Sequence, residues 1–572
     1  MKSIYKYMVL IALLHLNVEI LAQNKTFCSP VNINYMFQNP FRKQSFREGA
    51  DPNIILIKDK YYLFASKSGG YWYSDDMLDW KFISSKTLPI SDYAPTVIEY
   101  NNTVYFVASS EKPSTIYFNP DPLEDNWKPM SQPFPIMLYD PNFFKDTDGK
   151  LYLYYGCSNT IPLKVVELDQ NMLPKGAPVD LIKHNPASHG WEVPGENNEK
   201  NVNGAIEGSW VNKFNNKYYL QYASSGTQYK SYANGVYTSN SPFGPYKYEN
   251  YSPFSYKPGG FTTGTGHGTT FQDKYGNYWH ATNITLSLRH AFERRIGLFP
   301  AAFDKDGVLR TFTAFGDYPT IVPKRKVNFE KEDLFRGWML LSYKKKAKAS
   351  SQDPKFEIAN AFDENLKTLW SAQSGDSGEW LSVELDDKSI VNAIQVNFAD
   401  QGASTLNSKS TNLQYCYKIW ASNDEVNWKL IVDKSNNDKD ACHDYIELDK
   451  AVKAKYIKVE NIRVPQGNFS IFDLRIFGLK QGKKPKDAKD IVIERNVNDG
   501  RKALVKWTRD NSATGYVVKW GGDKNKLYSS YMVYDGDSVE LTGLNKDDKY
   551  FYSIDVFNES GITKGKQIIF GN

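Results

Sequence analysis

The chain has 572 residues, which is too long for a single hydrophobic core and predicts several domains. Hydrophobic residues make up 41% and charged residues 24%, a globular composition that excludes a disordered chain. A net charge of +5 is too small at this length to argue for a nucleic-acid partner, and a neutral polymer fits it as well.

The N-terminus has the features of an export signal. Lys2 and Lys6 give a basic start, residues 8–14 form a short apolar run, and Ala22 offers a small-residue cleavage point. The apolar run is too short for a membrane anchor, and no later stretch could span a bilayer. We therefore expect a signal peptide over residues 1–22, no membrane association, and a secreted or periplasmic protein.

The chain contains four cysteines: Cys28, Cys157, Cys416 and Cys442. After export disulfides are permitted, and Cys416 and Cys442 fall in one predicted domain, but sequence alone does not decide whether they pair. No CxxC or HExxH spacing occurs, so a catalytic zinc site is not expected.

Short alternating or aromatic-rich runs, separated by Gly, Asn, Asp and Pro turns, predict an all-β protein. Two basic, polar stretches, 343–348 and 480–489, interrupt the runs and are typical of linkers. They leave three predicted domains, over residues 27–340, 345–480 and 487–572.

The first domain repeats internally. A short aromatic strand preceded by a turn recurs five times, and the copies begin at Lys60, Thr103, Lys150, Lys217 and Asn277. Each copy reads as the second strand of a hairpin. Five such hairpins predict a five-bladed β-propeller, with a β-sandwich as the alternative.

Upstream of each copy, the start of the preceding strand carries a distinctive residue: Asp51, Ala94, Asp140, Glu207 or His267. The innermost strand of each blade lines the central channel of a propeller, so these side chains should converge. Three acids at close range cost free energy in a purely structural protein, and their convergence therefore indicates a catalytic centre.

Hydrolysis of a glycoside needs one carboxyl group as proton donor and another as base or nucleophile, and a third can raise the donor's pKa. Glu207 is the best donor, because Gly208 and Trp210 beside it combine close approach with an aromatic wall. Asp51 is then the base and Asp140 the modulator, and this chemistry requires no cofactor.

The motifs around these acids, Ala50-Asp51-Pro52, Tyr139-Asp140-Pro141 and Ile206-Glu207-Gly208, resemble glycoside hydrolase family 43 over roughly residues 45–320. The resemblance implies an inverting enzyme with Asp51 as general base, Asp140 as pKa modulator and Glu207 as general acid. It favours an exo-acting α-L-arabinofuranosidase or β-xylosidase that acts on side chains of plant-type or similar polysaccharides. A β-galactofuranosidase or β-galactosidase of the same fold is an alternative, because residues 295–308 resemble a subset with varied substrates.

The resemblance also suggests further site residues. His267 resembles a channel histidine that helps to hold calcium or sodium through water. Arg294 and Arg295 are both candidates for substrate binding, but neighbours on a strand face opposite ways, and the spacing to Pro300 favours Arg294. The other predicted substrate contacts are aromatic: Trp72, for which a place in the blade core is the alternative, Phe143 and Trp210.

The second domain resembles the discoidin-like, or factor 5/8 type C, domains, many of which are family 32 carbohydrate-binding modules. The matching motifs include Ala361-Phe362-Asp363, Thr368-Leu369-Trp370 and Trp380-Leu381-Ser382. The resemblance implies a β-sandwich with a calcium ion near Asp363, closed by Asp473. A jelly roll that binds nothing is the alternative.

The third domain resembles fibronectin type III. Residues 503–507 supply an early buried Trp, and Leu544 and Tyr550 have the spacing of a tyrosine corner. We expect this domain to act as a spacer.

Two other functions compete with this interpretation. A retaining fructan hydrolase would have Arg before the second Asp-Pro and Cys after the Glu, where this chain has Tyr139 and Gly208. A non-catalytic carbohydrate-binding propeller would not need both Asp51 and Glu207. The sequence therefore predicts a monomeric hydrolase whose partner is an oligo- or polysaccharide.

Overall fold

The computed structural model describes residues 25–38, 44–89, 92–110, 112–386, 389–404 and 413–571; the predicted signal peptide lies outside them. The described residues form 42 strands and two short 3-10 helices, η1 (Gly190–Glu192) and η2 (Ile358–Phe362), as the all-β prediction requires. Among these residues, no helix has the length and apolar character needed to cross a membrane.

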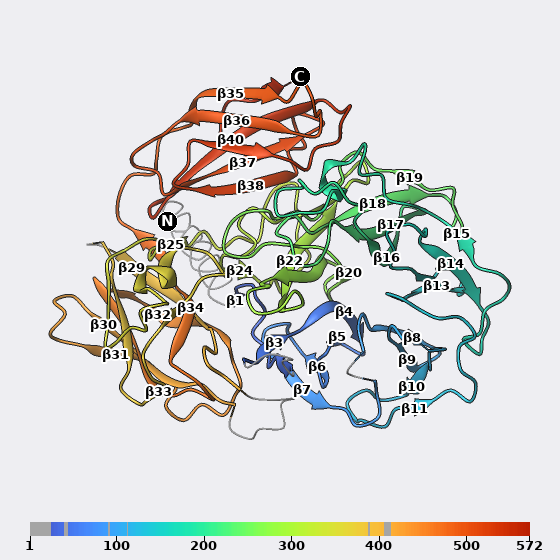
Figure 1. The fold of residues 1–572 in the computed structure, drawn as a ribbon, viewed down its shortest axis with the longest axis horizontal. Coiled ribbons are helices and arrows are strands. Elements are labelled where there is room, and N and C mark those ends of the chain that lie inside the picture. Colours follow the sequence, from blue (N-terminus) through green and yellow to red (C-terminus); the bar gives the residue numbers. More distant parts are fainter. Residues whose placement is uncertain are drawn as a thin grey trace, which may run out of the picture.

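Five four-stranded antiparallel sheets, each built from consecutive strands, form the predicted five-bladed propeller (Figure 1). The first strands of the blades contact one another in ring order, from blade 1 through blade 5 and back to blade 1. The strands are β4 (Ala50–Ile57), β5 (Lys60–Ser66), β6 (Gly70–Ser74) and β7 (Lys81–Ser84) in blade 1; β8 (Thr96–Tyr100), β9 (Thr103–Val107), β10 (Tyr117–Asn119) and β11 (Lys128–Pro129) in blade 2; β12 (Asn142–Lys145), β13 (Leu151–Tyr155), β14 (Lys164–Leu168) and β15 (Val179–Asp180) in blade 3; β16 (Ile206–Phe214), β17 (Lys217–Ser224), β18 (Ala233–Ser239) and β19 (Lys247–Tyr248) in blade 4; and β20 (Thr269–Gln272), β21 (Tyr278–Thr285), β22 (Arg294–Phe303) and β23 (Leu309–Thr311) in blade 5.

The repeated aromatic strands are the second strands of the blades, as predicted. All five residues of β13 are buried, and β5, β17 and β21 are buried beyond their first residue. Each sheet is covered on both faces by its neighbours, so both faces of its central strands are apolar or aromatic.

The second domain consists of two five-stranded sheets packed into a β-sandwich. One sheet contains β25 (Met339–Leu340), β27 (Trp370–Ser371), β29 (Ser389–Phe398), β32 (His443–Lys453) and β34 (Ser470–Lys480), and the other contains β26 (Ala347–Ala349), β28 (Trp380–Glu384), β30 (Cys416–Ser422), β31 (Lys429–Asp433) and β33 (Tyr456–Arg463). All four cysteines lie among the described residues and each is free, so Cys416 and Cys442 do not pair.

The third domain is a smaller β-sandwich. Its sheets contain β35 (Lys489–Arg495), β36 (Ala503–Thr508) and β39 (Ser538–Leu541), and β37 (Gly515–Gly521), β38 (Ser529–Tyr534), β40 (Tyr550–Asn558), β41 (Gly561–Thr563) and β42 (Ile569–Gly571). The backbone amide of Asn545 donates to the Tyr550 hydroxyl at 3.0 Å, the hydrogen bond expected of a tyrosine corner.

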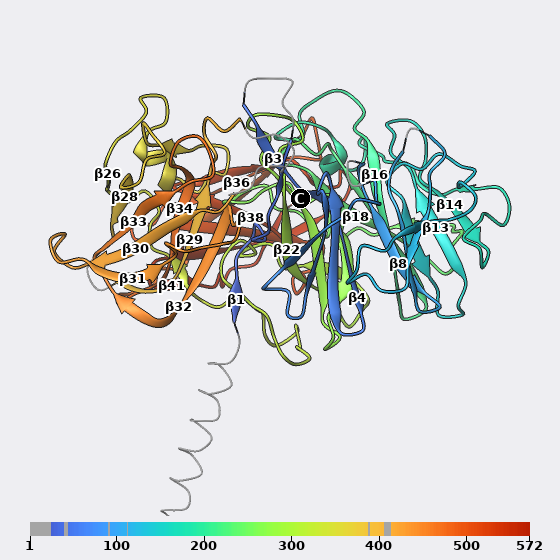
Figure 2. The same cartoon turned by 90° about the horizontal axis from the view of Figure 1, so that it is seen from below.

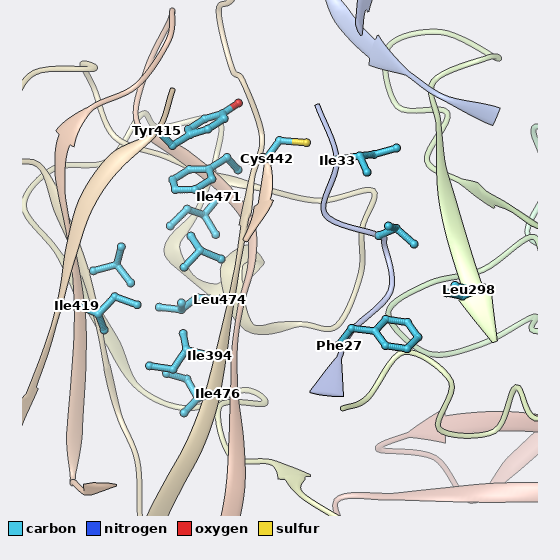
Figure 3. Close-up of a cluster of buried hydrophobic side chains, with 14 of the residues drawn as sticks. Phe27, Ile33, Leu298, Ile394, Tyr415, Ile419, Cys442, Ile471, Leu474 and Ile476 are labelled. Carbon is cyan, nitrogen blue, oxygen red and sulfur yellow. The ribbon is translucent and has the colours of Figure 1, made fainter. Parts of the chain in front are cut away.

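The N-terminal segment joins the propeller to the second domain. It contributes two short pairs, β1 (Thr26–Phe27) with β24 (Thr320–Ile321), and β2 (Met36–Gln38) with β3 (Phe46–Glu48). Figure 3 shows Phe27 and Ile33 between Leu298 of β22 and the core of the second domain, and all three belong to one buried cluster. In Figures 1 and 2, β3 lies between the second domain and the blades.

The third domain packs directly against the propeller. A domain that served only as a spacer would not require such contacts. The amide of Gly190 donates to the carbonyl of Leu544 at 2.9 Å, and Lys526 pairs with Asp304 at 2.8 Å. Lys345, in the first predicted linker, also pairs with Glu559 of this domain at 3.0 Å. The apolar faces buried between the units make the three domains one body.

Candidate active site

Within two residues of the start of four of the five inner strands lies a non-glycine residue in the left-handed backbone region: Asp51 (φ 51°), Ala94 (φ 47°), Asp140 (φ 48°) and His267 (φ 47°). In blade 4 this conformation falls on Gly208 (φ 61°), so Glu207 precedes the equivalent position by one residue. A Cβ on Gly208 would lie 2.7 Å from the His267 ring, so only glycine fits there. Bulges at the starts of β4 and β16 accompany these conformations and redirect the side chains.

Asp51 is held as a carboxylate. Ser66 Oγ donates to its Oδ2 at 2.6 Å, and Asn283 Nδ2 and Arg294 Nη1 donate to its Oδ1 at 2.9 and 3.1 Å. Burial alone would raise the pKa of Asp51, but Arg294, His267 and these hydrogen bonds outweigh it and lower the pKa below its ordinary value. Asp51 is therefore suited to accept a proton.

Asp140 has the opposite electrostatic character. Ser109 Oγ and the amide of Gly208 donate to its carboxylate at 3.3 and 3.2 Å. Burial and the negative charge of Asp51 nevertheless raise the pKa of Asp140 to about 7. This carboxyl group titrates near neutral pH.

Glu207 is suited to donate a proton. Burial and the charge of Asp140 raise its pKa, although His267 and two hydrogen-bond donors, Tyr232 and Cys157, oppose the rise. The Tyr232 hydroxyl donates to Oε1, and Cys157 Sγ donates to Oε2 at 3.1 Å. Two carboxyl groups whose pKa values are pushed apart, Asp51 down and Glu207 up, form an acid–base pair.

The three acids line one cavity of about 620 Å³, together with His267 and Arg294. Its wall includes Tyr93 and Phe292, whose ring centroids are 5.7 Å apart at 61°. Phe292 is 37% exposed, so part of its face is free to contact a ligand. An aromatic wall beside polar groups suits a sugar ring, which has apolar faces and a polar edge.

Arg294 and Arg295 face opposite ways, as their adjacency on β22 predicts. Arg294 reaches the cavity and bridges Asp51 to Glu48, whose Oε1 it contacts at 2.8 Å. Arg295 is only 1% exposed and donates to His443 of the second domain at 2.9 Å. The prediction that Arg295 binds substrate therefore does not agree with its position.

The three aromatic residues predicted to bind substrate also lie outside the cavity lining. Trp72 is fully buried and packs on Phe82, so it lies in the blade core, which was the alternative to substrate binding. Phe143 is 4% exposed and belongs to the core between blades 2 and 3. Trp210 is half-buried and donates from Nε1 to the carbonyl of Thr270 at 2.9 Å.

Four residues that hold the acids were not predicted, yet they share a position in the repeat. The second strand of a hairpin runs antiparallel to the first, so its end lies beside the start of the inner strand, where the acid sits. These end-of-strand residues are Ser66, Ser109, Cys157 and Asn283. Extending the repeat alignment by six or seven residues past the starts already identified would have found them.

The predicted metal ligands occupy two places. His267 Nδ1 lies 3.3 Å from Asp51 and 3.6 Å from Asp140, so an ion at this residue would have to be reached through its other ring nitrogen. In the second domain, Asp473 is 1% exposed and accepts the amide of Glu364 at 2.9 Å, while Asp363 accepts from Thr368. Burial raises the pKa of both carboxyl groups, that of Asp363 to about 6, as expected where a cation would offset buried negative charge.

Comparison with known proteins finds a family match in two of the three domains. Residues 37–309 match the family described as glycosyl hydrolases family 43, and residues 346–472 match the F5/8 type C domain. No curated protein sequence matches the chain.

Several solved structures are similar to the chain at low identity. An endo-1,4-beta-xylanase from Bacteroides thetaiotaomicron is 24% identical, with 50% of this chain and 98% of that chain covered and a TM-score of 0.41. A family 43 protein from Bacillus licheniformis is 14% identical, with coverage of 94% and 91% and a TM-score of 0.42. An alpha-L-arabinofuranosidase from Clostridium thermocellum is 17% identical, with coverage of 46% and 93% and a TM-score of 0.34. These values are too low to carry an argument about the sugar.

Proposed function

We propose that the protein is a glycosidase that inverts the anomeric configuration of its carbohydrate substrate, in line with the match of residues 37–309 to glycosyl hydrolases family 43. The observation that carries the acid–base assignment is the opposite shift of two carboxyl groups in one cavity, and the inverting outcome is proposed from the motifs around the three acids. The pKa of Asp51 is lowered and that of Glu207 is raised, which gives a base and an acid at the same pH.

In the proposed reaction, water attacks the anomeric carbon while the glycosidic bond breaks. Asp51 accepts a proton from the water, and Glu207 gives its proton to the leaving oxygen, so the products are a free sugar and an alcohol. Asp140 acts as modulator, because its charge raises the pKa of Glu207. Arg294 keeps Asp51 ionised.

The proposed substrates are terminal sugars on the side chains of plant-type polysaccharides. We propose exo-acting α-L-arabinofuranosidase or β-xylosidase activity, in line with the motifs around the three acids. The cavity volume of about 620 Å³ lies within the range of about 300–1,000 Å³ typical of small-molecule sites, which suits a short sugar segment. A β-galactofuranoside or β-galactoside is the alternative.

A panel of nitrophenyl glycosides tests the substrate. We expect release of nitrophenol from the α-L-arabinofuranoside or the β-xyloside, whereas turnover of only the β-galactofuranoside or β-galactoside would select the alternative. Proton NMR of the first-formed product tests the stereochemistry. A product with retained configuration would contradict the role of Asp51 as general base.

Replacement of the acid tests catalysis itself. Glu207→Gln should lower kcat by at least about 100-fold, because no proton reaches the leaving oxygen. Glu167→Gln is the matched control, since Glu167 lies on β14 outside the cavity and pairs with Lys175. A Glu207→Gln variant that kept wild-type turnover would contradict the role of Glu207 as general acid. A wild-type protein that turned over none of the glycosides would favour the non-catalytic, carbohydrate-binding propeller.

The appended domains extend the proposal. We propose that the second domain binds glycan and holds calcium near Asp363 and Asp473, and that the third domain is fibronectin type III-like, which its tyrosine corner supports. Loss of thermal stability on chelation, restored by calcium, would test the ion. Export to the periplasm or outside the cell, a monomeric state and an ion at His267 stay predictions.

A further inference from the structure

We propose that the second domain positions the catalytic residues, through arginines that alternate along the chain with residues of the active site. This inference rests on the proposed function, because it assigns a positioning role within the same site. The arginines are Arg47 and Arg295. Arg47 directly precedes Glu48 in the sequence, and Arg295 directly follows Arg294.

Two strands bring these residues together. On β22, Arg294 faces the cavity, while Arg295 faces the second domain. On β3, Glu48 faces Arg294, while Arg47 faces the second domain. Arg295 Nη1 also donates to the carbonyl of Arg47 at 2.6 Å, which ties β22 to β3. The pair of Arg294 and Glu48, which contacts Asp51, is thus fixed to strands whose other faces meet the second domain.

The contact at Arg295 is a chain of two hydrogen bonds through His443. Arg295 Nε donates to His443 Nε2 at 2.9 Å, and His443 Nδ1 contacts Asn397 Oδ1 at 2.8 Å. His443 is fully buried, and burial with two nearby arginines keeps its pKa far below the ordinary value. A neutral ring accepts at one nitrogen and donates at the other, so both hydrogen bonds are satisfied together.

The contact at Arg47 is an ion-pair cluster. Arg47 Nε contacts Asp400 at 2.8 Å, and Nη1 contacts Asp440 at 2.7 Å. The Arg47 side chain is fully buried, and its Nη2 donates to the Tyr415 hydroxyl at 3.1 Å. Buried ion pairs of this kind fix geometry, since removing one partner leaves a buried charge unpaired.

A third contact supports the aromatic wall of the cavity. The loop 286–293 carries Phe292, and Arg289 in the same loop donates to the carbonyl of Ala399 in the second domain at 2.5 Å. Arg289 also pairs with Glu293 at 2.7 Å. The contacts at Arg289 and Arg295 join the second domain to the segment that carries the cavity-lining residues Phe292 and Arg294. The contact at Arg47 holds β3, whose Glu48 pairs with Arg294, and a loosely tethered binding module would need none of these contacts.

The test separates positioning from stability. His443→Leu removes the acceptor of Arg295, and we expect kcat to fall by about tenfold or more with KM changed by less than about threefold, because a small displacement of the base acts on the chemical step. His443→Gln keeps an acceptor and should recover much of the loss. Asp400→Asn, which preserves shape at Arg47, is the second variant and decides the question if His443→Leu does not fold.

Lys439→Ala is the matched control. Lys439 of the second domain pairs with Asp79 of blade 1 at 2.7 Å, and both side chains are exposed and remote from the cavity lining. Wild-type kcat in His443→Leu and Asp400→Asn, or an equal loss in Lys439→Ala, would overturn the proposal. A wild-type protein without glycosidase activity would overturn the proposed function instead, and the positioning role with it.

Discussion

Asp140 is joined to the residue that follows Glu207: the amide of Gly208 donates to Asp140 Oδ2 at 3.2 Å. A carboxylate oxygen of each acid and the sulfur of Cys157 lie within 4.8 Å of one another. At such a distance, the ionisation of one acid must affect the other. The charge of the modulator therefore acts on the titration of the proton donor.

Asp140→Asn should narrow the pH range of activity from the alkaline side. After burial, the charge of Asp140 is the largest cause of the raised pKa of Glu207, so its removal lowers that pKa. Glu207 then loses its proton at a lower pH, and the alkaline limb of kcat/KM moves down. The measurement is a pH–rate profile of both proteins, and an unmoved alkaline limb would contradict the coupling.

The same substitution should change stability in a pH-dependent way. The pKa of Asp140 is raised to about 7 in the folded protein, so the stability that it contributes at low pH is lost as the pH rises through about 7. Asparagine does not titrate. The Tm of Asp140→Asn should be compared with the Tm of wild type at pH 4 and at pH 8. We expect the difference to favour the variant more strongly at pH 8 than at pH 4. An equal difference at both pH values would contradict the raised pKa.

Tyr232→Phe should move the alkaline limb in the opposite direction. The Tyr232 hydroxyl donates to Glu207 Oε1, which stabilises the carboxylate and lowers the pKa of Glu207. Its loss raises that pKa, so the limb moves up, and kcat falls by about tenfold because the donor is less well oriented. Shifts of the same sign in Tyr232→Phe and Asp140→Asn would contradict this account.

Much of this arrangement could be predicted from the sequence, because a propeller repeats. The turn and aromatic strand of each hairpin set the blade register, and that register places Asp51, Asp140 and His267 at one position. The one-residue offset of Glu207 was not predictable, because it depends on the bulge that puts Gly208 in the left-handed region.

The predicted aromatic substrate contacts lie outside the cavity lining for a physical reason. In blades covered on both faces, a tryptophan such as Trp72 serves the core as well as it would serve a sugar, and local sequence does not distinguish the two. Phe292, which does line the cavity, lies in a loop whose position depends on contacts with the second domain. Such contacts between distant parts of the chain leave no local pattern.

Arg294→Lys should move the acid limb of activity to higher pH. Burial raises the pKa of Asp51 and Arg294 is the strongest opposing influence, so weakening that contact raises the pKa. Lysine keeps the charge but cannot bridge both Asp51 and Glu48 as the guanidinium does. Arg294→Met should shift the limb further and cost about 3–5 kcal/mol of stability, because two buried carboxylates lose their partner. Unchanged acid limbs in both variants would contradict the role of Arg294.

Cys157 should be a slow but activity-sensitive site of alkylation. Burial of its sulfur and the nearby carboxylates of Glu207 and Asp140 raise the pKa of this thiol, so the reactive thiolate is scarce at neutral pH. Cys157 as a residue is nevertheless exposed, whereas Cys28, Cys416 and Cys442 are buried, so iodoacetamide should modify Cys157 first in the folded protein. The added group would enter the cavity and remove the donor to Glu207, and activity should fall in step with modification.

Cys157→Ala provides the control for this prediction. The variant should keep kcat within about tenfold of wild type, because Tyr232 still donates to Glu207, and it should resist iodoacetamide. Mass spectrometry of the labelled protein, taken alongside residual activity, measures both quantities. Inactivation of Cys157→Ala at the wild-type rate would show that another residue reacts, and full activity in wild type labelled at Cys157 would place this thiol away from the substrate.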